Sequence, residues 1–195
     1  MTPGRYERAI EAIDAANRED PAREVYLGRE LPRELVYSLR MTAWLERLDP
    51  TAPEALRLAV RAQHLRRFKI SRDSYPEGRH GYLRWRLDCQ QMHATEASRI
   101  LEEESYDQET IDCVQSLIMK HQIHDNPPSQ TVEDAACLVF LEGYLADFSR
   151  KHDEEKLIGI LRKTWRKMSP QAQDLAMQID LEPGLQALVK KALTI

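Results

Sequence analysis

Apolar residues recur every three or four positions along most of the chain, which is the period of a helix with one buried face. Ile10 and Ile13 share one such stripe, and Leu56, Val60 and Leu65 form another. Glycine is scarce and runs of β-branched residues are few, so the sequence predicts helices and no strand. The predicted helices cover residues 6–16, 33–48, 53–68, 79–103, 108–121, 132–148, 154–167 and 170–178, with a short one after Pro183.

Prolines mark the boundaries around the predicted sixth helix. Pro127 and Pro128 follow each other directly, and two successive prolines predict a break in helical structure. Thr131, followed three residues later by Asp134, resembles a helix N-cap with an acid in the first turn. Residues 132–148 are apolar on most sides, so we expect this helix to run through the centre of the molecule.

The length and composition fit one domain. The chain has 195 residues, 42% of them hydrophobic, and predicts a single-domain, all-α helical bundle over residues 1–195. No apolar stretch approaches the roughly 20 residues of a membrane span and the N-terminus has no apolar signal core, so we expect a cytoplasmic protein. Cys89, Cys113 and Cys137 are far apart and form no CxxC pair, which predicts reduced core residues.

Charge is distributed unevenly, although the net charge is only −4. Nine Arg and Lys stand against two acidic residues between Arg57 and Arg86, and eight acidic residues stand against one arginine between Asp88 and Asp112. The negative net charge and the few interleaved aromatic residues argue against nucleic-acid binding. The basic segment is either an anion pocket or a solvated face paired with the acidic segment.

Histidines and carboxylates on the predicted helices are candidates for a metal site. His64, His93 and Asp134 supply two imidazoles and a carboxylate, a donor set that Mn, Fe, Zn and similar divalent ions accept. Glu96 lies on nearly the same helix face as His93, and Glu133 precedes Asp134, so either carboxylate is a candidate catalytic base. A histidine on a helix is also an ordinary packed or surface residue, and spacing leaves that alternative open.

The run HATEASRILEEESYDQETIDCVQSLIMKHQIHDNPPSQTVEDAACLVFLE, which begins at His93, resembles the middle of an HD-domain phosphohydrolase. In that family a His on one helix, a His-Asp pair on the next and an Asp on a later one hold a divalent metal. The resemblance therefore implies a divergent HD-domain-like core with His64, His93 and Asp134 as ligands. The sequence departs from the pattern at Ala94, where the paired Asp is expected, and Glu96 is the candidate replacement.

A second resemblance extends over almost the whole chain. The chain resembles the domain of unknown function 4202 family in the segments DPAREVYLGRELPRELVYSLRMTAWL, RAQHLRRFKISRDSYPEGRHGYLRWR, MHA, EDAACLVFLE and ILRKTWRKMS. Some relatives carry a glutamyl-tRNA synthetase label. This sequence lacks the HIGH-like and KMSKS-like ATP-binding motifs of such enzymes, so the label has no support here.

The basic segment supplies candidates for substrate binding. Guanidinium groups near a metal would suit a phosphate or carboxylate, because Arg binds planar oxyanions through paired donors. Lys120 closes the predicted fifth helix, where its charge also complements the helix dipole. Arg66 is expected to point to water. The candidate substrate-binding residues are Arg67, Arg79, Tyr82, Arg86 and Lys120.

Taken with these residues, the resemblance to HD-domain proteins implies a divalent-metal phosphohydrolase that acts on a nucleotide or another small phosphorylated metabolite. The metal would polarise the phosphoryl group and lower the pKa of a bound water. One alternative is a non-catalytic helical protein that binds an anion or a partner and has a degenerate metal site. Another is an oxygen-using metalloenzyme, since two His and a carboxylate also suit iron.

Overall fold

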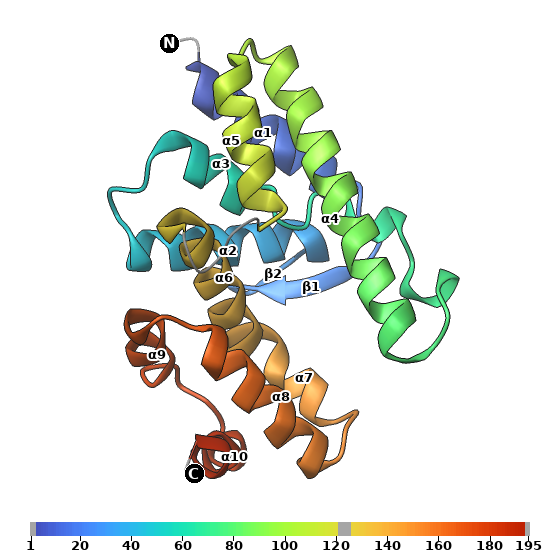
Figure 1. Ribbon diagram of the computed structural model, residues 1–195, viewed down its shortest axis with the longest axis vertical. Helices are drawn as coiled ribbons and strands as arrows, with labels where there is room; N and C mark the ends of the chain where they lie inside the picture. Colours follow the sequence, from blue (N-terminus) through green and yellow to red (C-terminus); the bar gives the residue numbers. More distant parts are fainter. Residues whose placement is uncertain (1–2, 121–125, 194–195) are drawn as a thin grey trace.

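The computed structural model describes residues 3–120 and 126–193, and most of these are helical, which confirms the all-α fold class (Figure 1). Within this part of the chain no helix combines the length and the apolar character needed to cross a lipid bilayer. The helices are α1 (Arg5–Arg18), α2 (Arg33–Leu48), α3 (Glu54–Arg61), α4 (Gly78–Glu103), α5 (Gln108–Ile118), α6 (Pro127–Val139), α7 (Leu145–Ser149), α8 (Glu154–Lys167), α9 (Pro170–Ala176) and α10 (Pro183–Leu193).

The centre of the molecule is formed by α2 and α6 (Figure 1). Helices α1, α3, α4 and α5 lie toward one end, and α7 to α10 lie toward the other. Met41 and Leu45 of α2 and Leu138 of α6 are fully buried, as are Val132 and Val139 of α6. This burial confirms the prediction that the sixth helix runs through the core, because an element covered on several sides must be apolar on several sides.

The prediction of no strand is wrong for residues 23–32. Strands β1 (Arg23–Tyr26) and β2 (Arg29–Pro32) form an antiparallel hairpin, with Tyr26 opposite Arg29. The two turn residues, Leu27 and Gly28, both have positive φ, which suits a two-residue hairpin turn. The hairpin buries little apolar surface, so its sequence lacks the alternation that marks a half-buried strand.

The predicted helix 53–68 is shorter than expected, because α3 ends at Arg61. The chain continues through turns and two short 3₁₀ segments, η1 (Arg67–Lys69) and η2 (Arg72–Ser74). Arg66 has a left-handed backbone, and its N–H donates to Oδ1 of Asn17 in α1 at 3.0 Å. This tertiary hydrogen bond favours an irregular path over the helix that the apolar spacing predicts.

The sixth helix begins earlier than predicted. Pro127 and Pro128 occupy its first turn, where a missing N–H costs no intrahelical hydrogen bond, and Asn126 is the N-cap. Thr131 is therefore not a cap; its hydroxyl donates to the carbonyl of Pro127. Beyond α6 a π-helical segment, η3 (Phe140–Tyr144), leads into α7.

The cysteines and the predicted fifth helix differ in part from the sequence expectations. Cys89 and Cys137 are buried as predicted, but Cys113 is exposed on α5, because it lies on the face of that helix turned away from the core. The predicted fifth helix extends to residue 121, whereas α5 ends at Ile118. His121 itself lies outside the described residues.

Candidate functional site

A cavity of about 490 Å³ lies between α2, α4 and α6, and residues of η3, α7 and α8 complete its wall. Several charged and polar side chains line it together with aromatic ones. The residues that line the cavity come from segments far apart in the sequence, including the irregular stretch after α3. The predicted site residues that line it are His64, Arg67, Tyr82, Arg86, His93, Lys120 and Glu133.

His64 is held rigidly in this wall. Its Nδ1 lies 3.1 Å from Oε2 of Glu34, and its ring stacks on Tyr37 with centroids 3.5 Å apart and planes within 6°. Arg67 Nη1 lies 3.3 Å from Nδ1 and 3.4 Å from Nε2 of His64. A nitrogen equidistant from both ring nitrogens and in the ring plane would collide with the carbon between them, so Arg67 lies over the ring face. His64 is thus layered between Tyr37 and Arg67.

The carboxylate of Glu34 determines the tautomer of His64. A carboxylate only accepts, so Nδ1 carries the proton and Nε2 keeps its lone pair. Burial, and then the charge of Arg67, lower the pKa of His64 well below its usual value, so the ring is neutral. Burial also raises the pKa of Glu34, and the positive charge of Arg67 only partly offsets this. The pair presents a neutral imidazole with a basic Nε2.

His93 has the same arrangement on α4. Its Nδ1 lies 2.7 Å from the carbonyl oxygen of Leu65, which can only accept, so Nδ1 carries the proton. Burial, and then the neighbouring His64, lower the pKa of His93 to about 3. The two imidazole centroids are 5.9 Å apart. Neither Nε2 lone pair faces an in-plane donor among the described residues, so both are free to accept from a ligand or water.

Three guanidinium groups share this cavity. Arg33, Arg67 and Arg86 have no carboxylate partner in the part of the chain that the structure describes. Arg67 lies 4.6 Å over the ring of Trp85, and Arg86 lies 5.9 Å from the ring of Tyr82, so aromatic faces position both groups. Unpaired cations beside neutral imidazoles make the cavity attractive to an anion.

Asp134 is not brought to the two histidines. Its Oδ1 accepts from the backbone N–H of Ser169 at 2.9 Å and from Nε2 of Gln130 at 2.9 Å, and it does not line the cavity. Because α6 begins near Asn126, Asp134 faces the start of α9. His64 and His93 could still hold a metal ion, but the predicted set of three does not fit one. Across residues 3–120 and 126–193 no three His, Cys, Asp or Glu side chains gather as a metal site.

Glu96, Arg79 and Arg66 also lie away from the cavity. Glu96 pairs with Arg66 at 3.4 Å and with Arg99 at 3.5 Å, so it does not replace the missing Asp beside His93. Arg79 is exposed in the first turn of α4. Arg66 was expected to point to water, but its side chain is only 16% exposed and forks onto Glu19 at 2.8 and 3.0 Å. The irregular backbone after α3 turns Arg66 inward.

Glu133 reaches the cavity but is not a free base. Its Oε2 lies 2.6 Å from Nζ of Lys120, and its Oε1 lies 3.0 Å from Nζ of Lys167. Burial alone would raise the pKa of Glu133, but the two ammonium groups lower it to about 2. A carboxylate held this firmly in its ionised form takes up a proton poorly at neutral pH.

The sequence reasoning missed Glu34, Tyr37 and Arg33 at the start of α2. A signal was present: Glu34 shares a helix face with Ser38, Met41 and Leu45, so a carboxylate stands on the stripe that enters the core. A buried acid needs a partner, and that partner, His64, lies thirty residues away along the chain.

Comparisons with known proteins yield one match. The model of a protein family, Domain of unknown function (DUF4202), matches residues 7–189. No curated protein and no solved structure matches the chain. The match includes the residues that line the cavity, from Arg33 to Thr164. The chain belongs to the DUF4202 family.

Proposed function

We propose that the protein binds a small phosphorylated metabolite in the cavity and hydrolyses its phosphate ester. One observation carries the proposal: three guanidinium groups without a carboxylate partner among the described residues line the same cavity as the partly buried Glu34–His64 pair. Cations gathered without a carboxylate repel one another, and a phosphate is the dianion that paired guanidinium donors fit. This also favours the anion pocket over the solvated basic face.

In the proposed reaction His64 is the general base. Its Nε2 takes a proton from a water molecule while the water oxygen attacks phosphorus, and the ester P–O bond breaks. The leaving oxygen then receives the proton from His64, so the products are the alcohol and inorganic phosphate. Glu34 holds the ring in the required tautomer and stabilises the imidazolium that forms. The guanidinium groups neutralise the charge on the phosphoryl oxygens.

Non-catalytic anion binding is the second candidate. It is favoured by the internal partners of Asp134, Glu96 and Glu133, which leave no described carboxylate of this set free to bind a metal. In that case the same cavity holds the ligand without transforming it. The divalent metal ion expected from the sequence stays a prediction, and no step above depends on it.

The test combines binding with turnover. Wild-type protein is titrated calorimetrically with inorganic phosphate, and phosphate release is measured from p-nitrophenyl phosphate, nucleoside monophosphates and sugar phosphates. His64→Asn is the matched variant, because its side-chain N–H₂ can still donate to Glu34 while Nε2 is lost. We expect this variant to bind phosphate within about threefold of wild type and to hydrolyse at least about 100-fold more slowly.

The outcomes separate the candidates. Phosphate binding without release from any of these esters would establish the binding protein instead of the hydrolase. Turnover that is equal in wild type and His64→Asn would remove His64 as the base. Absence of phosphate binding in the wild type would overturn the whole proposal.

A further inference from the structure

Lys120 and Glu133 form a buried ion pair at the wall of the cavity. Lys120 Nζ lies 2.6 Å from Oε2 of Glu133, and both side chains are almost completely buried, at 11% and 7% exposed. The other oxygen of Glu133 is bound by Lys167, whose side chain is 52% exposed. One carboxylate therefore holds two ammonium groups, one on the cavity side and one on the solvent side, and the three charges sum to a net positive site.

The backbone at Lys120 suggests that its side chain has a role beyond the turn. Lys120 follows the end of α5 with a φ of +54°, and its N–H donates to the carbonyl of Leu117. Glycine is the usual residue in this left-handed position after a helix, because a side chain there is strained. A lysine that only complemented the helix dipole would point to solvent, whereas this ammonium is turned inward onto Glu133.

The ammonium of Lys120 has more N–H donors than acceptors among the described residues. It carries three N–H groups, and Glu133 is its only acceptor among the described residues, so two N–H groups remain for a ligand. Its charge acts on the imidazole of His64, since it is one of the charges that lower the pKa of His64, after burial and Arg67. Lys120 is thus placed to meet the same ligand as His64.

The partners of the nearby carboxylates also favour binding of the ligand by Lys120. Asp134 is bound by the N–H of Ser169, Glu96 by Arg66, and Glu34 by His64. Each of these three acids already has a partner within the chain, so none of them is free to complete a metal site with the histidines. The positive charge that a phosphoryl group needs is instead supplied by Lys120 and the guanidinium groups.

We propose that Lys120, held by Glu133, is the cation that binds the ligand's phosphoryl oxygens in place of a divalent metal ion, so that the site works without metal. This inference rests on the proposed function, because it concerns the same cavity and the same phosphorylated ligand. Glu133 is in this scheme a positioning residue that orients the ammonium. Lys167 stabilises Glu133 from the solvent side and does not reach the ligand.

The test uses inorganic phosphate as the probe. Wild-type protein, purified without a histidine tag, is titrated by calorimetry in EDTA and again with Mn²⁺ or Zn²⁺ present. We expect the two dissociation constants to agree within about twofold. In the same buffer Lys120→Met should lose at least about tenfold in phosphate affinity, whereas Lys167→Met, which removes the other lysine from the same carboxylate, should stay within about twofold.

Controls keep the result unambiguous. Circular dichroism and thermal melting establish that both lysine variants are folded, and the EDTA comparison needs no variant. Loss of wild-type phosphate binding in EDTA, with recovery on adding Mn²⁺ or Zn²⁺, would overturn the inference while leaving the proposed function intact. A folded Lys120→Met that binds phosphate like wild type would do the same. Wild-type protein that binds no phosphate under any condition would overturn the proposed function, and this inference with it.

Discussion

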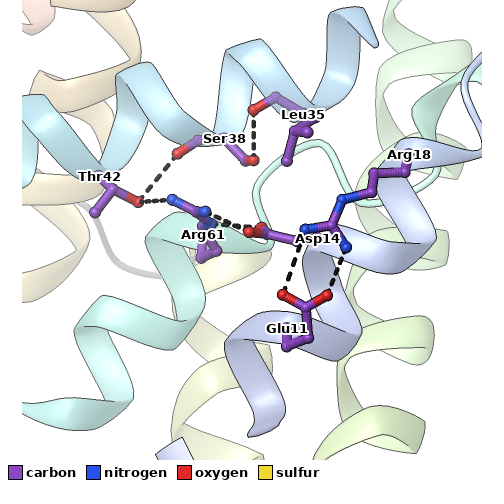
Figure 2. A network of polar contacts seen from close by, with 7 residues as sticks. All are labelled: Glu11, Asp14, Arg18, Leu35, Ser38, Thr42 and Arg61. Carbon is purple, nitrogen blue, oxygen red and sulfur yellow. Dashed lines mark hydrogen bonds and ion pairs between the residues drawn. The ribbon is translucent and has the colours of Figure 1, made fainter. Parts of the chain in front are cut away.

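Two polar clusters of the molecule use similar residues and differ in how many of their groups find a partner inside the chain. Between α1, α2 and α3, Arg61 donates to both oxygens of Asp14 at 2.7 and 2.6 Å, and to the hydroxyl of Thr42 at 3.0 Å (Figure 2). Thr42 and Ser38 in turn donate to backbone carbonyls of α2. In the cavity Arg33 and Arg86 face no carboxylate of the described chain, and two imidazole lone pairs are open.

The difference separates a structural cluster from a binding cluster. A buried arginine that donates to a carboxylate and a hydroxyl stabilises the packing of its helices. Few of its N–H groups then remain free to bind a ligand. Arg61 is such a residue, because its guanidinium is bound to Asp14 and does not line the cavity. Polar groups in a cavity that lack some of their hydrogen-bond or charge partners do not contribute the most that they could to stability. Proteins keep such groups mainly at functional sites.

The largest expected effect is in the structural cluster. Asp14→Ala leaves the guanidinium of Arg61 buried without its carboxylate, so we expect a loss of about 3–5 kcal/mol in the free energy of unfolding. Urea unfolding followed by circular dichroism measures it. Phosphate binding at low temperature, where the variant is folded, should stay within about twofold of wild type, because Asp14 does not line the cavity.

A neighbouring pair provides the control for this prediction. Arg18 and Glu11 lie 2.6 Å apart beside the buried cluster, but both side chains are substantially exposed (Figure 2). Surface ion pairs contribute little because water and salt screen them, so Arg18→Ala should cost less than about 1 kcal/mol. Equal losses in Asp14→Ala and Arg18→Ala would contradict the distinction between buried and exposed pairs.

Most of the fold could be predicted from the sequence because helices leave a local signal. Apolar spacing and prolines locate α1, α2, α4, α8 and α9 to within a few residues. The β1–β2 hairpin leaves almost no such signal, since its tip residue Leu27 is exposed and its strands bury little. The path after α3 depends on a hydrogen bond from Arg66 to Asn17, a contact that spacing cannot reveal.

The candidate site was predicted in part, and the errors follow from helix geometry. Successive helix residues point about 100° apart, so of the neighbours Glu133 and Asp134 only one can face the cavity. The true start of α6 turns Glu133 toward it and Asp134 toward Ser169. Glu34 was missed because its partner His64 is distant in the sequence. The HD-like core stays a prediction, since no solved structure matches the chain.

The next largest expected effect is a pH dependence of the free energy of unfolding, which arises because the two imidazoles of the cavity are neutral in the folded protein. His93 has a pKa of about 3 when folded and an ordinary value of 6.5 when unfolded. Below pH 6.5 the unfolded chain binds a proton that the folded chain does not, so stability falls as the pH drops and stops falling near pH 3. At pH 5 we expect a loss of about 2 kcal/mol relative to pH 8 from this residue, measured by urea unfolding at both pH values.

His93→Asn isolates this contribution. An asparagine side chain can replace the Nδ1 donor toward the carbonyl of Leu65 but does not titrate. The loss between pH 8 and pH 5 should therefore shrink by about 2 kcal/mol in the variant, and His64 accounts for a further loss in the same direction. An unchanged pH profile would mean that His93 is protonated in the folded state. Asp14→Ala, by contrast, should keep the wild-type profile, because it leaves both imidazoles in place.

The smallest effect tests whether the basic segment is a pocket or a surface. Arg86 lines the cavity close to Tyr82, whereas Arg84, on the same helix, is 68% exposed and pairs with Asp88 one turn later. A lost charge-assisted contact costs about 1.5 kcal/mol, so Arg86→Ala should weaken binding of inorganic phosphate at least about tenfold.

Arg84→Ala removes the same charge from the same helix and should stay within about 0.5 kcal/mol of wild type. Arg84 is a better control than Arg66, because Arg66 is bound to Glu19 and its removal disturbs the packing of α1. Calorimetric titrations of both variants at two salt concentrations distinguish a direct arginine–phosphate contact from long-range electrostatic attraction. Salt screens the long-range attraction strongly and the direct contact much less. Equal small losses in the two variants would make the arginines of α4 a solvated face, and the cavity would then have to bind its ligand through Arg33, Arg67 and Lys120 alone.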